Sequence, residues 1–135
     1  MALVTGFDHV GIRVTDIARA QAFYESLGFV ADPEEESPDA AARGLVHPSG
    51  IRIHLIYNGI ADDAVGNVLM DTQPKRPGYT HVAFLVEDMD AFVAWLRKMK
   101  IAITEGPVVM GSGRRRGCFV RDPDRNVLEF NELLA

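Results

Sequence analysis

Two stretches of the chain alternate apolar and polar residues at the period of a β-strand, and each leads into a stretch with the period of a helix. The alternating stretches are residues 7–14 and 79–86, and each predicts a strand with one buried face. Apolar residues then recur every three or four positions over residues 17–27 and 89–99, which predicts an amphipathic helix after each strand.

The residues at the ends of these helical stretches support both predictions. Asp16 and Asp88 stand where the helices should begin, and their carboxylates can accept hydrogen bonds from the first free backbone amides. Gly28 follows the first stretch and suits the left-handed conformation that often ends a helix.

The chain contains two copies of one pattern. Residues 7–11 match residues 79–83 at an offset of 72, and residues 51–55 match residues 126–130 at an offset of 75. A three-residue insertion in the second copy explains the difference between the two offsets. The repeat predicts a first module over residues 6–58, a linker over 59–78 and a second module over 79–133, all within a single domain.

Each module is predicted to complete itself with three shorter strands, which makes the order βαβββ. Two such modules predict an α+β fold with helices outside a curved mixed sheet. An acidic, alanine-rich segment, residues 34–42, is expected to be an exposed loop, and the glycine- and proline-containing linker is expected to be a mobile lid. The shorter strands are predicted at residues 29–31, 44–47, 51–57, 101–104, 117–121 and 126–131.

Composition narrows the class of protein without naming a function. The chain has 135 residues, 47% hydrophobic and 24% charged, and a formal net charge of −5, which argues against nucleic-acid binding. The single cysteine, Cys118, suits a reducing compartment. We expect neither a signal peptide nor a membrane span, because residues 1–5 lack a basic region followed by an apolar stretch and no apolar run is long enough. We therefore expect a cytoplasmic protein that does not bind membranes.

Three histidines and one glutamate occupy matching places in the two copies. His9 corresponds to His81, and His54 corresponds to Glu129. Imidazole nitrogen and carboxylate oxygen suit zinc, nickel, cobalt, manganese or iron. If the modules pack around a pseudo-twofold axis, the four side chains converge on one divalent ion. An ion that prefers five or six ligands keeps open positions for water or substrate, which is typical of a catalytic site.

These residues and their neighbours resemble the vicinal oxygen chelate superfamily, which includes glyoxalase I, methylmalonyl-CoA epimerase, extradiol dioxygenases and fosfomycin or bleomycin resistance proteins. The segments that carry the resemblance are residues 7–12, 80–84 and 119–130, and the resemblance extends from Phe7 to Leu133. It implies paired βαβββ modules that form a cup-shaped sheet around a metal ion, which the substrate chelates through vicinal oxygens. His9, His54, His81 and Glu129 fall on the metal-ligand positions of the superfamily.

The resemblance favours a glyoxalase-type lyase or isomerase, such as a lactoylglutathione lyase, which transfers a proton by way of a metal-bound enediolate. Glu129 is then the base, because it is the only carboxylate among the predicted ligands. One alternative is an Fe(II) extradiol-type dioxygenase, against which Phe119 counts, since those enzymes generally carry tyrosine at that place. Another is a resistance or binding protein that sequesters its ligand without chemistry.

Three adjacent arginines, at positions 114–116, give the main indication of a substrate. Arg114 and Arg116 are candidates to hold a carboxylate or phosphate by forked hydrogen bonds, and thiol conjugates such as those of glutathione or coenzyme A carry such groups. The resemblance also implies a homodimer that acts on a small molecule.

Overall fold

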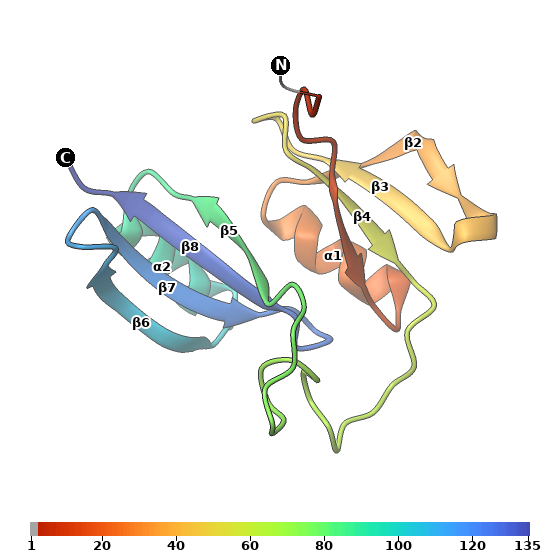
Figure 1. Cartoon of the computed structure of the whole chain (residues 1–135). Coiled ribbons are helices and arrows are strands. Elements are labelled where there is room, and N and C mark those ends of the chain that lie inside the picture. Colours follow the sequence, from red (N-terminus) through yellow and green to blue (C-terminus); the bar gives the residue numbers. More distant parts are fainter. Residues whose placement is uncertain (1–2) are drawn as a thin grey trace. The chain divides into compact units, whose positions relative to one another are not determined.

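The computed structural model describes residues 3–135, and the first two residues lie outside the described part. The chain forms two compact units, one that ends at Asp62 and one over Asp63–Ala135, which we call the N-terminal and C-terminal units (Figure 1). Each unit is one βαβββ module, as the repeat predicts, so the predicted α+β class and the two-module arrangement are confirmed.

The N-terminal unit contains a mixed four-stranded sheet in the order β1-β4-β3-β2. Strand β1 runs parallel to β4, whereas the other neighbours are antiparallel. The elements of this unit are β1 (Val10–Arg13), α1 (Ile17–Ser26), β2 (Val30–Ser37), the 3₁₀ helix η1 (Pro38–Ala40), β3 (Ala42–Val46) and β4 (Arg52–Ile56).

The C-terminal unit repeats this topology with the strand order β5-β8-β7-β6. Strand β5 is parallel to β8, and the other pairs are antiparallel. Its elements are β5 (His81–Leu85), α2 (Met89–Lys98), β6 (Ile103–Met110), β7 (Arg115–Arg121) and β8 (Val127–Leu133).

Both helices begin as predicted. The Asp16 carboxylate accepts from the amide of Arg19 at 3.0 Å, and the Asp88 carboxylate accepts from the amide of Ala91 at 3.1 Å. Gly28 has the positive φ, 103°, that lets the chain turn sharply after α1.

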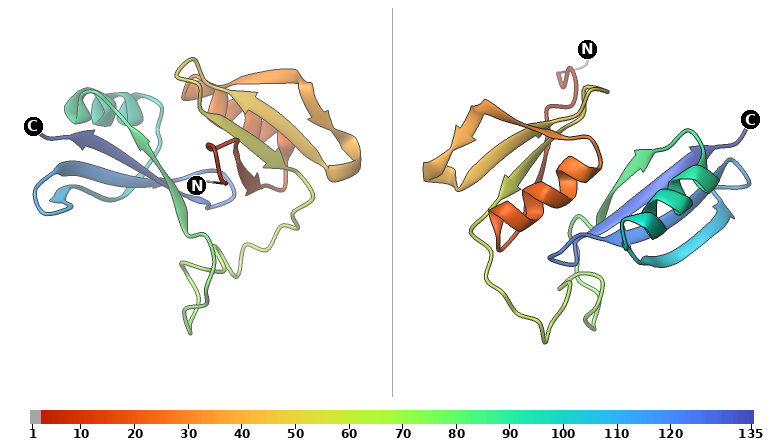
Figure 2. Two further views of the ribbon diagram at one scale, coloured as in Figure 1. Left: turned by 45° about the horizontal axis from the view of Figure 1, so that its top comes forward. Right: turned by 180° about the vertical axis from the view of Figure 1, so that it is seen from behind.

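In each unit the helix covers one face of the sheet (Figure 2). In β4, Ile53 and Leu55 are fully buried, while His54 between them points to the opposite face. In β8, Phe130 packs on Phe92 of α2 with ring centroids 4.5 Å apart. Glu129 therefore lies on the face away from α2, as the alternation predicts.

The strand boundaries correct two predictions. The segment 34–42 is not a loop, because β2 continues to Ser37 and η1 follows it. Strand β6 runs to Met110, well past the predicted end at residue 104. Both are edge strands with irregular register, which a simple alternating pattern does not reveal.

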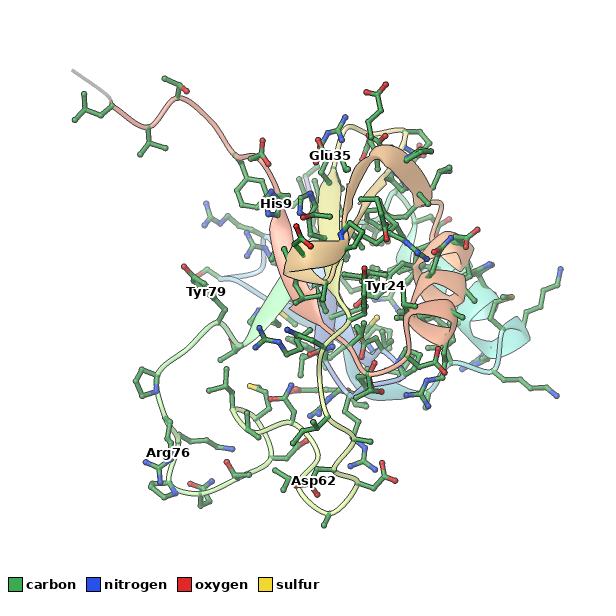
Figure 3. The ribbon with its side chains drawn as sticks, turned by 90° about the vertical axis from the view of Figure 1, so that its right-hand side faces the viewer. His9, Tyr24, Glu35, Asp62, Arg76 and Tyr79 are labelled. Carbon is green, nitrogen blue, oxygen red and sulfur yellow. The ribbon has the colours of Figure 1, made fainter. Side chains whose placement is uncertain are left out.

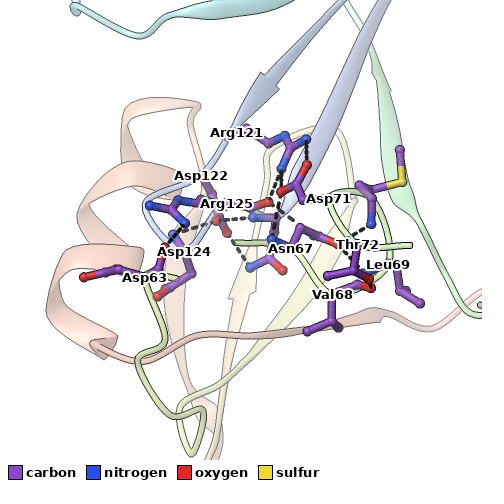
Figure 4. A network of polar contacts seen from close by, with 12 residues as sticks. Asp63, Asn67, Val68, Leu69, Asp71, Thr72, Arg121, Asp122, Asp124 and Arg125 are labelled. Atoms are coloured by element: carbon purple, nitrogen blue, oxygen red, sulfur yellow. Dashed lines mark hydrogen bonds and ion pairs between the residues drawn. The ribbon is translucent and has the colours of Figure 1, made fainter. Parts of the chain in front are cut away.

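Residues 63–72, within the predicted linker, are fastened to the end of β7 and to the turn that follows it (Figure 4). We call this segment the strap. Arg121 donates two hydrogen bonds to the Asp71 carboxylate, at 2.9 and 3.0 Å, and Arg125 donates to the carbonyl of Asp63 at 2.9 Å. The Asn67 side chain donates to the carbonyl of Arg125 at 3.2 Å. The strap thus belongs to the C-terminal unit.

Over residues 3–135, no helix is both long and apolar enough to span a membrane.

Candidate metal centre

The N-terminal unit brings two of the predicted ligands together. His54 lies in the middle of β4, and His9 lies just before β1, the strand that pairs with β4. The two imidazole rings stack with centroids 3.6 Å apart and planes 12° from parallel. Residues 45 positions apart in sequence therefore present adjacent nitrogen donors on one sheet face.

The C-terminal unit brings the other two predicted ligands together. His81 begins β5 and Glu129 lies in β8, its parallel neighbour, so that His81 Nε2 is 3.2 Å from Glu129 Oε1. Glu129 is only 8% exposed. Its other oxygen, Oε2, accepts a hydrogen bond of 2.5 Å from Nδ2 of Asn131, two residues along the same strand face.

The residues that precede His9 and His81 hold the two rings in the same way. His9 Nδ1 contacts the Asp8 carboxylate at 2.5 Å, and His81 Nδ1 lies 2.8 Å from Thr80 Oγ1. Asp8 and Thr80 are partners in the repeat. When Nδ1 is the donor in both contacts, Nε2 keeps its lone pair for a metal, as in many metal-bound histidines. The hydrogen bond from His9 also lowers the pKa of Asp8, so Asp8 stays ionised.

The donor atoms of both pairs suit a divalent ion. Ligand atoms about 2 Å from a metal lie roughly 3 Å from each other, which is close to the spacing of His81 Nε2 and Glu129 Oε1. Burial, and then the neighbouring His9, lower the pKa of His54, which keeps that imidazole neutral and able to bind a metal. In the described part of the chain no three His, Cys, Asp or Glu side chains are placed together so that they could hold a metal ion. The predicted ligands occur as two pairs, one in each unit.

A second carboxylate, which sequence reasoning did not single out, lies beside the N-terminal pair. Glu35 Oε2 is 3.8 Å from His54 Nε2, and Figure 3 labels Glu35 together with His9. Gly44 lies opposite His54 in the sheet, and a β-carbon there would be 2.5 Å from Glu35 Cβ. A residue larger than glycine at position 44 would collide with Glu35, so glycine is needed there for Glu35 to reach His54. Gly44 is the one signal in the sequence that points to this approach of Glu35 to His54.

The three consecutive arginines of the β6–β7 hairpin have different surroundings. Arg114 is exposed in the turn. Arg116 donates to Asp90 of α2 at 2.9 Å, on the helix-covered side of the sheet. Arg115 is half-buried, and none of the described residues forms a hydrogen bond or ion pair with its side chain.

Phe119 occupies the place beside His81 at which the sequence departs from the dioxygenase pattern. The two rings meet edge to face with centroids 5.8 Å apart. A phenyl ring there offers packing and no hydroxyl.

Comparison with known proteins agrees with this architecture. A family model described as the glyoxalase/bleomycin resistance protein/dioxygenase superfamily matches residues 6–130. A search of curated proteins gives no match.

Solved structures share the fold over nearly the whole chain. A glyoxalase family protein from Bacillus cereus is 24% identical with a TM-score of 0.70, and covers 100% of this chain and 99% of its own. A glyoxalase/dioxygenase from Nostoc punctiforme is 22% identical with a TM-score of 0.72, over 94% and 90% of the two chains. The fosfomycin resistance protein FosX from Listeria monocytogenes is 14% identical with a TM-score of 0.70, over 98% and 94%.

The family match spans most of both modules, and the repeat-related histidine and glutamate candidates lie at matching places in the two modules. This protein belongs to the glyoxalase/bleomycin resistance protein/dioxygenase superfamily.

Proposed function

We propose that this protein is a metal-dependent lyase or isomerase of the glyoxalase type. Its substrate is a small molecule that chelates one divalent ion through vicinal oxygens, and its ligands are His9, His54, His81 and Glu129. The observation that carries the proposal is the close pair of His81 Nε2 and Glu129 Oε1, with Glu129 buried and oriented by Asn131. A buried carboxylate beside an imidazole is stabilised by a bound cation.

In this proposal Glu129 is the base that moves the proton between adjacent carbons. When bound, the ion supplies Lewis-acid stabilisation of the negative charge that develops on the substrate oxygens. Asn131 donates to Oε2 of Glu129 and thereby fixes the direction of the carboxylate, while Oε1 faces His81. Asn131 acts through Glu129 and is a positioning residue.

Glu35 supplies a second carboxylate for proton transfer. The sequence alone left Glu129 as the single base, whereas Glu35 is close enough to His54 to share the ligand-bearing face of the N-terminal unit. We propose that Glu35 takes up or releases a proton beside His54. Arg114 and Arg116 stay predictions as substrate contacts, and a thiol conjugate stays the predicted kind of substrate.

Elemental analysis of protein purified without chelators is the experiment that tests this function. We expect about one zinc, nickel, cobalt or manganese per chain, lost in the His54→Ala variant because half of the N-terminal donor pair is removed. The His47→Ala variant is the matched control, since His47 lies outside the ligand set and contacts Ser49 in a turn. The Glu129→Gln variant should lose far more activity on hemithioacetals than metal affinity, because the amide cannot accept the proton.

Other results would replace the proposal. Iron in the purified protein, with oxygen consumption on catechols, would establish the dioxygenase alternative. No metal after reconstitution with each ion would leave a protein that binds a ligand without chemistry.

A further inference from the structure

Strand β7 presents alternate residues to the same sheet face as Glu129. Phe119 contacts His81, and a β-carbon at Gly117 would lie 2.3 Å from Oδ1 of Asn131. Arg115 is the next residue in this series, and its register partner is Leu133, two positions beyond Asn131 in β8. Arg116, by contrast, pairs with Asp90 on the opposite face. We call the face that carries Glu129, Asn131 and Arg115 the ligand face of the C-terminal unit.

Arg115 has hydrogen-bonding capacity that the described residues do not use. Its Nε is fully buried without a partner, and its two terminal nitrogens neither form a hydrogen bond nor are fully enclosed. The aliphatic part of the side chain lies over Gly111, where a β-carbon would be 3.3 Å from Cγ and 3.4 Å from Nε. A buried hydrogen-bond donor on a charged group costs free energy when it has no partner. The arrangement is therefore typical of a guanidinium that binds an anion.

Asn131 has a second unused polar atom on the same face. The amide nitrogen of Asn131 donates to Glu129, so the amide oxygen Oδ1 turns away toward Gly117. That oxygen is buried and has no hydrogen-bond donor, in a residue that is only 4% exposed. The ligand face thus carries two polar atoms without hydrogen-bond partners, Arg115 Nε on β7 and Asn131 Oδ1 on the neighbouring β8.

We propose that Arg115 binds an anionic group of the substrate, a carboxylate or a phosphate, through the fork of its guanidinium. The inference rests on the proposed function in taking the Glu129 face as the substrate face. Arg115 lies four residues along β7 from the residue opposite Glu129, which is about 13 Å at the rise of a strand. The substrate is therefore a molecule whose anionic group lies on the order of 10 Å from the atoms that react beside Glu129.

The test is the binding of inorganic phosphate and of acetate to the chelator-treated chain, measured by calorimetry and by the ¹⁵N shifts of arginine Nε–H groups. The wild type should bind one of the two anions more tightly than the other. We expect Arg115→Gln to weaken the binding of that anion about tenfold or more, because forked, charge-assisted hydrogen bonds are lost. The anion affinity of Arg115→Lys should lie between those of the wild type and Arg115→Gln, because lysine keeps the charge but lacks the forked geometry. Arg97→Gln is the matched control, because Arg97 is an exposed arginine near the end of α2.

A preference for phosphate identifies a phosphate ester, and a preference for acetate identifies a carboxylate; either supports the proposal. Equal affinity in the wild type and Arg115→Gln overturns it, as does loss of binding only in Arg114→Gln or Arg116→Gln. Absence of binding of either anion to the wild type also overturns it. Metal content is measured on the same preparations before chelation, so failure of the metal proposal is seen separately from failure of anion binding.

Discussion

At the scale of single residues, Gly117 shows how closely the environment of Glu129 is packed. A β-carbon at this position would lie 2.3 Å from Oδ1 of Asn131 and 3.3 Å from the carbonyl oxygen of Phe130. Asn131 cannot move aside freely, because its amide nitrogen donates a hydrogen bond to Glu129. The absence of a side chain at 117 is therefore a condition for the orientation of the proposed base.

We predict that Gly117→Ala lowers the free energy of unfolding by about 1–3 kcal/mol, the usual cost of an overpacked buried site. Urea unfolding followed by circular dichroism measures the change. Gly11→Ala is the control, because it also lies in a strand and its β-carbon would meet only Ile56 Cγ1 at 3.7 Å. Equal midpoints for the two variants would show that Asn131 is free to move.

Sequence reasoning found the paired ligand candidates at this scale and missed their carboxylate neighbour. Matching positions in the repeat point to His9, His54, His81 and Glu129, because equivalent places on equivalent strands present side chains to the same face. Glu35 has no such marker. Its approach to His54 depends on an irregularity of β2 and on the space over Gly44.

At the scale of elements, the strap is held by one ion pair with additional hydrogen bonds. Arg121 binds both oxygens of Asp71, and the backbone N–H of Asn67 donates to the same carboxylate at 2.8 Å. The hydrogen bond from Arg121, followed by that from Asn67, lowers the pKa of Asp71 from 3.8 to about 2. The ionised carboxylate thus stabilises the strap above the pKa of the unfolded chain, and this contribution is lost as the pH falls from about 4 toward 2.

We predict that Asp71→Asn increases hydrogen exchange at the amides of Asn67 to Asp71 at neutral pH, because the amide side chain removes the charge that Arg121 and Asn67 recognise. Asp62→Asn, in an exposed position outside the strap, is the control. In the wild type the same amides should lose protection between about pH 4 and pH 2. Unchanged protection in Asp71→Asn would mean that the other contacts suffice to hold the strap.

Helices and central strands were predicted more accurately than edge strands. Capping aspartates and a helical period are local signals, and they place α1 and α2 closely. Strands β2 and β6 each contain register shifts, so their sequences do not alternate cleanly over their full lengths.

At the scale of the whole molecule, each unit has its own core, and each leaves large apolar side chains in contact with solvent. Val30 in the N-terminal unit is 61% exposed, and Leu85, Val109 and Leu133 in the C-terminal unit are 60–67% exposed. Burial of such side chains against a second chain would be favourable.

We predict that the protein is a homodimer, with the mass of two chains in light scattering coupled to size exclusion. A dilution series is the control for association at high concentration alone. A single-chain mass at every concentration would contradict the prediction.

The sequence by itself determined the βαβββ order of each module, the starts of both helices and the identities of the paired ligand candidates. These features depend on local periodicity, on capping and on an internal repeat. Such signals involve residues that are close in the sequence or separated by a constant number of positions. Only the tertiary structure decided that Glu35 lies beside His54, that Asp71 fastens the strap to Arg121, and that Arg115 shares a face with Glu129 while Arg116 does not. Each of these depends on strand register and close packing between distant segments, and a shift of one residue in register would reverse every face.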